Sequence, residues 1–441
     1  MAMIIWSVAF LGAIGFFKYQ LWGRFGVLLK LRRDDLRDYS PKTLFKRLVN
    51  LAIYGFAQKK FFLRDQVPGL MHVVIFWGFC VLGIQVITMF ARGWIDEFRL
   101  PFFGMEHLGG PYGLVKDIFE LAVMFGVCIA LFRWIVTKPK RLMGILPAEA
   151  KLHAHSHFEA VLILCFIFTI MLSGLLYDAG RMVFMSDHPE MALERQWQPV
   201  SAFFASLLDG RAIMAKWVSD GSWWIHNLVI LCFLNVLPRS KHFHIVTALP
   251  NVFFGRLESK GRLPKKDYAG DNAIFGRSTP IQFTWKQALD MYSCTECGRC
   301  SAVCPAAATG KTLAPRQFLL NLRDAVYENQ NKILSGAKDG FDVVVGEGKA
   351  VIDDVVWSCV ECRACEEACP VNIEYVDKIV DLRQHLVQEA SRFPAELNRA
   401  FQGMERNSNP WGISSAERTA WGGGMNAPEL RQRKDAEDLD Y

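Results

Sequence analysis

The stretch that organises the second half of the chain reads Cys294-Thr-Glu-Cys297-Gly-Arg-Cys300-Ser-Ala-Val-Cys304-Pro305. A second copy reads Cys359-Val-Glu-Cys362-Arg-Ala-Cys365-Glu-Glu-Ala-Cys369-Pro370. Both copies follow the spacing C-x2-C-x2-C-x3-C-P. Four thiols at this spacing, followed by proline and present twice, are typical of a segment that wraps two [4Fe-4S] clusters.

In such a pair of motifs, three cysteines of one copy hold one cluster together with the fourth cysteine of the other copy. The first predicted ligand set is Cys294, Cys297, Cys300 and Cys369. The second is Cys359, Cys362, Cys365 and Cys304. Zinc or disulfides are the alternatives, but a zinc site takes its ligands from two spaced pairs rather than from dense runs. Intact clusters also indicate a reducing compartment.

The composition divides the chain into an apolar part and a part typical of soluble domains. Of the 441 residues, 51% are hydrophobic, and the long apolar runs fall within the first 240. The four cysteines outside the motifs lie in these runs, and we expect them to be small buried hydrophobic residues: Cys80, Cys128, Cys165 and Cys232. The net charge of +6 is modest. We expect membrane lipid, and no nucleic acid, as a partner.

Five apolar runs are long enough to cross a bilayer as helices, which takes about 20 residues. They cover roughly residues 2–22, 67–91, 113–136, 157–177 and 222–240. No small-residue cleavage site follows the first run, so we expect it to be retained as a helix. The prediction is an all-α membrane protein, with a five-helix transmembrane bundle followed by a mainly helical two-cluster domain.

The predicted organisation has four parts. They are a transmembrane domain (1–240), a connector with several Pro and Gly (241–283), a cluster domain (284–392) and a C-terminal arm or linker (393–441). In the cluster domain, Thr284 is predicted to cap a helix that runs toward Tyr292. Further helices are expected over about 315–332 and 374–392.

Lysine and arginine predict the orientation, because they concentrate in cytoplasmic loops. The segment 24–64 carries 11 basic residues against three aspartates, and the loop 137–156 is also basic. The loops 92–112 and 178–221 are mixed in charge. We therefore expect the N-terminus outside and the cluster domain in the cytoplasm, with the bundle in a prokaryotic cytoplasmic membrane.

Four histidines at the ends of the apolar runs are candidate haem ligands: His72, His157, His226 and His244. Ionisable groups in membrane helices are costly and tend to be functional, and imidazole is a common axial ligand of haem iron. His72 and His244 are expected to hold one haem b near the inner face, with His157 as the main rival. His226, predicted near the outer start of the fifth helix, is a candidate for a second haem.

Two further points limit these assignments. His226 and His244 are 18 residues apart, or about 27 Å in a continuous helix, so they cannot share one iron. Interfacial histidines can also simply be solvated, which is the preferred interpretation for His153, His155 and His242.

Residues 1–250 resemble the cytochrome b (gamma-type) subunit of respiratory nitrate reductase. The resemblance rests on Met71-His72, Phe76-Trp77-Gly78-Phe79 and Lys241-His242-Phe243-His244. Residues 284–390 resemble the helical ferredoxin subunit of heterodisulfide reductase. The combination is similar to membrane-bound iron–sulfur oxidoreductases related to heterodisulfide reductase, some of which are electron-transfer flavoprotein:menaquinone oxidoreductases.

The chain departs from these families in two places. The resemblance to the nitrate reductase protein implies paired histidines on helices two and five, matching His72, His226 and His244. A second helix-two histidine is missing from 79–83, and His107 in the next loop is a possible substitute. The related fused proteins continue into Cys-rich domains, so we expect such a domain on a separate polypeptide, or this chain to be a fragment.

The resemblance implies a quinone-linked oxidoreductase subunit. It would pass electrons between a cytoplasmic donor and membrane quinone through two [4Fe-4S] clusters and haem b, in either direction. The donor would be an electron-transfer flavoprotein or a Cys-rich iron–sulfur partner. The alternatives are a membrane subunit of a quinol-linked disulfide reductase and a non-haem anchor for a ferredoxin domain. No quinone ligand stands out, since Arg92 and Arg181 fit interfacial anchors equally well.

Overall fold

The computed structural model describes residues 1–34, 37–38, 40–62, 66–105, 107–258, 261–263, 275–417 and 419–425, without the side chains of 148–156. Regular structure in the described ranges is helical, and β pairing is limited to two isolated bridges. The prediction of an all-α protein is confirmed. The chain forms two compact units, Met1–Leu382 and Arg383–Tyr441.

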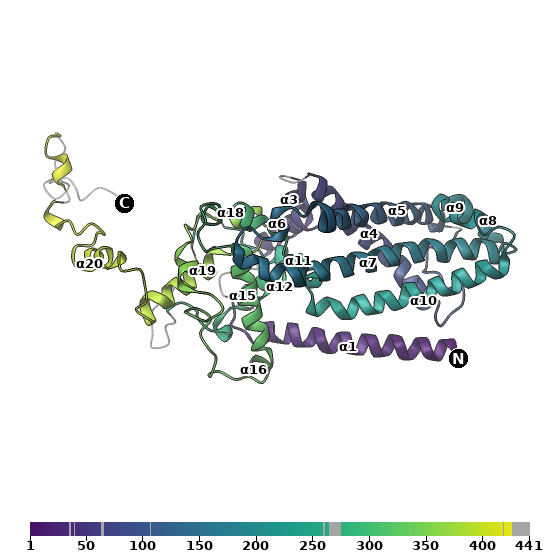
Figure 1. The fold of residues 1–441 in the computed structure, drawn as a ribbon, viewed down its shortest axis with the longest axis horizontal. Helices are drawn as coiled ribbons and strands as arrows, with labels where there is room; N and C mark the ends of the chain where they lie inside the picture. Colours follow the sequence, from purple (N-terminus) through teal and green to yellow (C-terminus); the bar gives the residue numbers. More distant parts are fainter. Residues whose placement is uncertain are drawn as a thin grey trace. The chain divides into compact units, whose positions relative to one another are not determined.

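Five helices of the first unit are long and apolar enough to cross a membrane, which confirms the predicted bundle. They are α1 (Ala2–Lys30), α4 (Gln66–Ala91), α5 (Gly109–Phe132), α7 (Pro147–Phe184) and α10 (Ala212–Val236). They lie side by side in Figure 1, where α4 packs on α5, α5 on α7, and α10 on both α7 and α1. A π-helical turn, Arg133–Thr137, extends α5, and a 3-10 turn, Leu237–Arg239, extends α10.

The bundle packs through a small apolar core and close helix contacts. Leu82 of α4, Val123 of α5 and Met171 of α7 belong to one buried cluster. A Cβ atom at Gly78 would lie 2.3 Å from the Val123 side chain, so glycine lets α4 approach α5. The four isolated cysteines are exposed on the bundle surface, which a membrane would cover with lipid. The prediction that they are buried inside the protein was therefore wrong.

The fifth helix begins about ten residues earlier than predicted. Its first turns contain Lys216 and Asp220, which lower the hydropathy, but the two side chains form an exposed ion pair of 2.9 Å. Because α10 starts at Ala212, His226 lies near its middle rather than near its start. At the other end, Pro238 lies in the 3-10 turn that ends the helix. The straight path of about 27 Å to His244 is therefore broken.

Short helices cap both ends of the bundle. At one end, α8 (Pro189–Trp197) and α9 (Pro199–Ser206) fill the loop between α7 and α10. Asp117 of α5 accepts the backbone N–H groups of Val200 at 2.6 Å and Ser201 at 3.0 Å, which fixes the start of α9. The other end carries α2 (Pro41–Asn50), a π turn (Leu51–Phe56), α3 (Lys59–Phe62), α6 (Lys140–Met143), a 3-10 turn (Lys241–Phe243) and α11 (His244–Phe253).

The cysteine domain, residues 275–382, is a set of short helices. As predicted, Thr284 caps α12 (Trp285–Tyr292), and Gln287 completes a capping box. The helix predicted over 374–392 is divided into α19 (Val376–Gln384) and a π turn (His385–Glu389). The remaining helices are α13 (Arg299–Ala302), α14 (Pro305–Ala308), α15 (Pro315–Glu328), α16 (Gln330–Leu334), α17 (Asp353–Trp357) and α18 (Ala364–Ala368), after a 3-10 turn (Pro280–Gln282).

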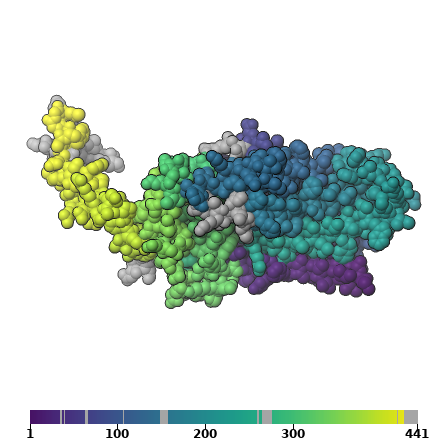
Figure 2. Space-filling view, viewed as in Figure 1, coloured from purple at the N-terminus to yellow at the C-terminus, as the bar shows by residue number. Residues whose placement is uncertain are grey.

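The cysteine domain packs directly on one end of the bundle, as its green surface against the blue and purple helices shows in Figure 2. Arg24 of α1 donates to Gln330 Oε1 at 2.9 Å and lies over the Tyr327 ring. Arg37 donates to both oxygens of Glu374 at 2.7 Å. The basic segment predicted to be cytoplasmic therefore lies at the same end of the bundle as the cysteine domain.

The second unit contains α20 (Leu397–Asn407) and two 3-10 turns, Ser415–Glu417 and Ala420–Gly422. Phe393 and Phe401 pack edge to face, with their ring centroids 4.9 Å apart. Trp411 and Trp421 are exposed.

Candidate functional site

The two cysteine motifs fold into the same loop. Glu296 and Glu361, which follow the first cysteine by two positions, both have left-handed backbone angles, with φ of 54° and 55°. Gly298 and Arg363 are left-handed as well, with φ of 71° and 57°, and each precedes a short helix. These turns curl the backbone around the thiols. The backbone N–H of Glu361, for example, donates to Cys359 Sγ at 3.3 Å.

The two loops enclose two cavities. The first, about 270 Å³ in empty volume, has four cysteines in its lining: Cys294, Cys297, Cys300 and Cys369. The second, about 370 Å³, is lined by the other four: Cys304, Cys359, Cys362 and Cys365. Each cavity thus combines three thiols of one motif with the fourth thiol of the other, which is the grouping that the spacing predicts.

The chemistry of the cavities fits an iron–sulfur cluster. Burial raises the pKa of Cys300 to about 12 and that of Cys369 to about 11, and it raises the pKa of Cys365 further. Buried thiols ionise only beside compensating positive charge, which bound iron supplies. Among the described residues, no three Cys, His, Asp or Glu side chains converge as they would around a single metal ion. The thiols instead surround a space.

The first cavity lies next to α3, the short helix that precedes α4. Lys60 Nζ donates to the Cys369 carbonyl at 3.0 Å, and Arg299 Nη1 donates to the Lys60 carbonyl at 3.1 Å. The Arg299 guanidinium lies 5.0 Å from the centre of the Phe61 ring. Phe61 in turn stacks on the His72 imidazole at 4.2 Å and 7°. A continuous series of contacts therefore links this cavity to a predicted haem ligand.

The same cavity also borders the loop between α5 and α7. A Cβ atom at Gly298 would lie 2.2 Å from the Arg141 carbonyl oxygen. Arg316, which lines the cavity, donates to the carbonyls of Arg141 at 3.2 Å and Glu296 at 3.3 Å. Two separate loops of the bundle thus contact the first cysteine motif.

His72 and His244 are oriented in the same way. Nδ1 of His72 donates to Gln58 Oε1 at 3.0 Å, and Nδ1 of His244 donates to the Lys241 carbonyl at 2.8 Å. Such bonds fix the ring and direct Nε2 toward a metal in haem and zinc sites. The pKa of His244 falls to about 3, mainly through burial and then the charge of His242, with a smaller contribution from His72. His244 is therefore neutral, as an axial ligand must be, and its environment includes His72.

His226 is the most isolated of the candidates. Its Nδ1 donates to the Ile170 carbonyl at 2.9 Å, while its buried Nε2 has no partner among the described residues. An orphaned imidazole nitrogen fits an axial ligand. His107, the possible partner, is exposed in the loop before α5.

His157 differs from the other three candidates. Its Nε2 lies 3.1 Å from the Trp134 carbonyl, so the atom that would bind iron donates to the backbone instead. His242, for which solvation was the preferred interpretation, lies 3.7 Å from Glu159. The side chains of His153 and His155 lie outside the described residues.

Sequence reasoning missed Lys60, Phe61 and Arg299. The first two belong to a basic segment that the charge pattern explains by orientation alone, and Arg299 is one of many arginines. Their roles depend on tertiary contacts between segments more than 200 residues apart in sequence.

Comparison with known proteins supports the 4Fe-4S part of this arrangement. Residues 290–373, which include all eight motif cysteines, match the 4Fe-4S dicluster domain. The chain is 30% identical to the probable iron-sulfur-binding oxidoreductase FadF of Bacillus subtilis, over 89% of this chain and 57% of that protein. It is 29% identical to the EtfAB:quinone oxidoreductase of Syntrophomonas wolfei, over 92% of this chain and 58% of that protein.

A further similarity covers a smaller part of the chain. Over 24% of this chain and 52% of the relative, it is 30% identical to a subunit of the ferredoxin:CoB-CoM heterodisulfide reductase of Methanosarcina mazei. No solved structure matches the chain. The chain thus spans a little over half the length of the two relatives that it matches along most of its own length. It is a membrane-type chain with a 4Fe-4S dicluster domain, similar to iron–sulfur oxidoreductases related to heterodisulfide reductase.

Proposed function

We propose that the chain is a membrane electron-transfer subunit of an oxidoreductase. It exchanges electrons between a cytoplasmic donor and a quinone in the prokaryotic cytoplasmic membrane. The donor is an electron-transfer flavoprotein or a Cys-rich iron–sulfur partner. The relative named EtfAB:quinone oxidoreductase, which is similar over 92% of this chain, supports both ends of this reaction.

In this proposal the eight motif cysteines hold two [4Fe-4S] clusters, one in each cavity. His72 and His244 hold a haem b at the cysteine-domain end, and His226 belongs to a second haem. When bound, these groups supply centres that take up and release single electrons. The protein residues fix the rings of His72 and His244 and keep the His244 imidazole neutral.

The series of contacts from Cys369 through Lys60, Arg299 and Phe61 to His72 is the observation that carries the proposal. A domain that is merely tethered needs only a linker. Here a cysteine cavity and two similarly oriented imidazoles, those of His72 and His244, meet at the same end of the bundle. This arrangement favours electron transfer over the non-haem anchor.

A membrane component of a quinol-linked disulfide reductase is the second candidate. The similarity to the heterodisulfide reductase protein of Methanosarcina mazei, over 24% of this chain, favours it. That reaction uses the same residues with the opposite direction of electron flow. The partner distinguishes the two candidates, because a flavoprotein would reduce this chain, whereas a disulfide-binding Cys-rich protein would oxidise it.

The test is made on anaerobically purified protein in detergent. We expect about eight irons per chain, from two clusters of four, and a b-type haem band in the reduced-minus-oxidised spectrum. Reduced electron-transfer flavoprotein should then reduce a short-chain naphthoquinone when the chain is present. Tightly bound zinc without iron would contradict the cluster assignment. Iron–sulfur clusters without haem would instead support the alternative that the bundle is a non-haem membrane anchor.

A further inference from the structure

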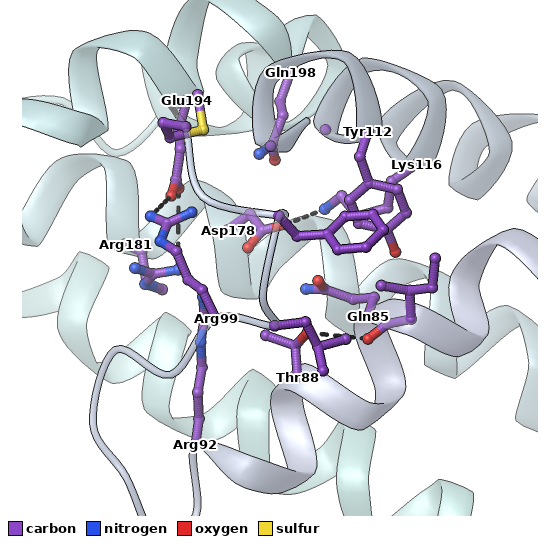
Figure 3. A pocket seen from close by; sticks show the side chains of 16 residues that line it. Gln85, Thr88, Arg92, Arg99, Tyr112, Lys116, Asp178, Arg181, Glu194 and Gln198 are labelled. Carbon is purple, nitrogen blue, oxygen red and sulfur yellow. Dashed lines mark hydrogen bonds and ion pairs between the residues drawn. The ribbon is translucent and has the colours of Figure 1, made fainter. Parts of the chain in front are cut away.

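The end of the bundle remote from the cysteine domain contains a pocket between α4, α5, α7 and the start of α9 (Figure 3). We call it the far-end pocket. Its empty volume is about 480 Å³, counting the part that opens to the outside. Its polar lining includes Gln85, Thr88, Tyr112, Lys116, Asp178 and Gln198.

Buried charges form the inner wall of the far-end pocket. Lys116 of α5 forms an ion pair with Asp178 of α7, and its Nζ also lies 3.5 Å from Glu120 Oε2. The side chains of Lys116 and Glu120 are each 2% exposed. Ionisable groups inside membrane helices are costly, and they usually mark a path for a substrate, an ion or a proton. A purely structural contact at this depth would be better made by apolar side chains.

Gln198 supplies the second, independent observation. Its side chain points into the far-end pocket toward Asp178 in Figure 3. The residue is 7% exposed, and its Oε1 has no hydrogen-bond partner among the described residues. Buried amide oxygens are nearly always satisfied. An unsatisfied one that faces a cavity indicates a ligand that donates a hydrogen bond there.

The rest of the lining is mixed, because it includes Arg92, Arg99, Arg181 and Glu194 as well as apolar side chains. Ile84, Leu100 and Phe103 contribute apolar surface, while Lys116 and Gln85 carry N–H donors. The pocket also lies at one end of helices that are long and apolar enough to cross a membrane. This combination favours a membrane-dissolved molecule with a polar ring over a soluble polar metabolite.

We propose that the far-end pocket binds the ring headgroup of a membrane quinone, an inference that rests on the proposed function. A quinone offers two carbonyl acceptors to donors such as Lys116, and a quinol offers hydroxyl donors to Gln198 Oε1. The pocket is also near His226. A Cβ atom at Gly174 would lie 2.5 Å from Glu120 Oε1 and 3.7 Å from His226 Cε1, so Glu120, which is 3.5 Å from Lys116, lies close to that histidine.

Neighbouring ion pairs have a simpler structural role. Arg99 pairs with Glu190 at 2.6 Å, and Arg181 pairs with Glu97, which fastens the segment 92–105 over the helix ends. Arg92 donates to the Tyr177 hydroxyl at 3.0 Å. Fastening accounts for these arginines but leaves the unpaired Gln198 oxygen unexplained.

The experiment measures binding without electron transfer. The fluorescent quinol analogue 2-heptyl-4-hydroxyquinoline N-oxide is titrated into the oxidised full-length protein, and its quenching gives the dissociation constant. Loss of one buried hydrogen bond in Gln198→Leu should weaken binding about tenfold. Gln85→Leu, on α4, should also weaken it. The matched control is Gln20→Leu on α1, since Gln20 is also 7% exposed with an unpartnered Oε1.

Iron content and the haem spectrum are measured on all three variants, so that only folded protein is compared. Equal binding by wild type, Gln198→Leu and Gln85→Leu, in a chain that still reduces quinone, would show that the quinone does not bind in the far-end pocket. The proposed function would then still stand. If the wild-type protein neither binds the analogue nor reduces quinone, the proposal that quinone is its substrate would be wrong as well. Weaker binding confined to the two pocket variants supports the site.

Discussion

Gly298 and Arg363 occupy equivalent positions in the two cysteine loops, and both have a left-handed backbone. Arg363 has room for its side chain, which pairs with Glu366 at 3.0 Å and Asp377 at 3.2 Å. At Gly298 a methyl group would collide with the Arg141 carbonyl. Glycine is therefore required only in the loop that packs against the Arg141 carbonyl.

This difference predicts that Gly298→Ala damages the first cavity. The alanine meets the Arg141 oxygen at 2.2 Å in addition to the left-handed backbone, whose cost is about 1–2 kcal/mol. We expect a lower unfolding temperature in detergent and loss of up to half of the iron. Gly310→Ala is the matched control, because Gly310 has φ of +76° and no neighbour within 4 Å. Equal effects of the two substitutions would show that the contact with Arg141 is unimportant.

At the scale of single residues, the sequence predicted how the eight cysteines are grouped but not which residues surround them. The grouping of the thiols follows from spacing within two short motifs, which is local information. The positions of Lys60 and Phe61 beside Cys369 and His72 depend on how the bundle and the cysteine domain pack. Lys116 and Glu120 do carry a signal in the sequence, since charges are rare inside apolar runs, but the pocket that Lys116 lines also depends on Gln198 from a distant loop.

Among the elements, α10 shows what hydropathy alone cannot predict. The apolar run predicted that a helix is present. Because the first turns of that helix contain charged residues, the predicted start was residue 222 rather than Ala212. In the folded chain, those charges pair across one turn, and Ser219 donates to the Tyr177 carbonyl at 3.2 Å. The helix therefore starts at Ala212, and the interpretation of His226 changes with it.

The histidine substitutions test the helix pairing of the haem site. His72→Ala and His244→Ala should each abolish the b-haem band assigned to the cysteine-domain end and leave the iron–sulfur signal intact. His157→Ala should keep the band, because its Nε2 already donates to the Trp134 carbonyl. His226→Ala should spare this haem, since His226 lies near the middle of α10.

The spectra are recorded as reduced-minus-oxidised differences, with iron content as the control for folding. Loss of the band in His157→Ala, together with its retention in His244→Ala, would contradict the assignment. In that case α7 would replace α11 as the source of the second ligand.

For the whole molecule, the Lys and Arg pattern predicted which loops lie together. The segment 24–62 and Arg141 contact the cysteine domain, while Arg99, Arg181 and Glu190 belong to the opposite end. The pattern could not predict that several of the basic side chains also bind the cysteine domain. Arg37 does so through Glu374.

The predicted orientation can be tested with two exposed serines, Ser206 at the end of α9 and Ser335 after α16. In intact cells, a membrane-impermeant thiol reagent should modify Ser206→Cys and spare Ser335→Cys, as read by peptide mass spectrometry. After the cells are opened, both should react. Modification of Ser335→Cys alone in intact cells would show that the cysteine domain lies outside. It would therefore contradict both the predicted orientation and the cytoplasmic donor.

The placement of the first cysteine cavity and the far-end pocket at opposite ends of the bundle has an energetic consequence. An electron that passes from one to the other crosses the electric field of the energised membrane, and each elementary charge is worth about 2.3 kcal/mol per 100 mV. With the cysteine domain on the negative side, the field pulls electrons toward the pocket. A donor too weak to reduce quinone in detergent would then succeed in charged vesicles, and an ionophore that collapses the voltage would stop it.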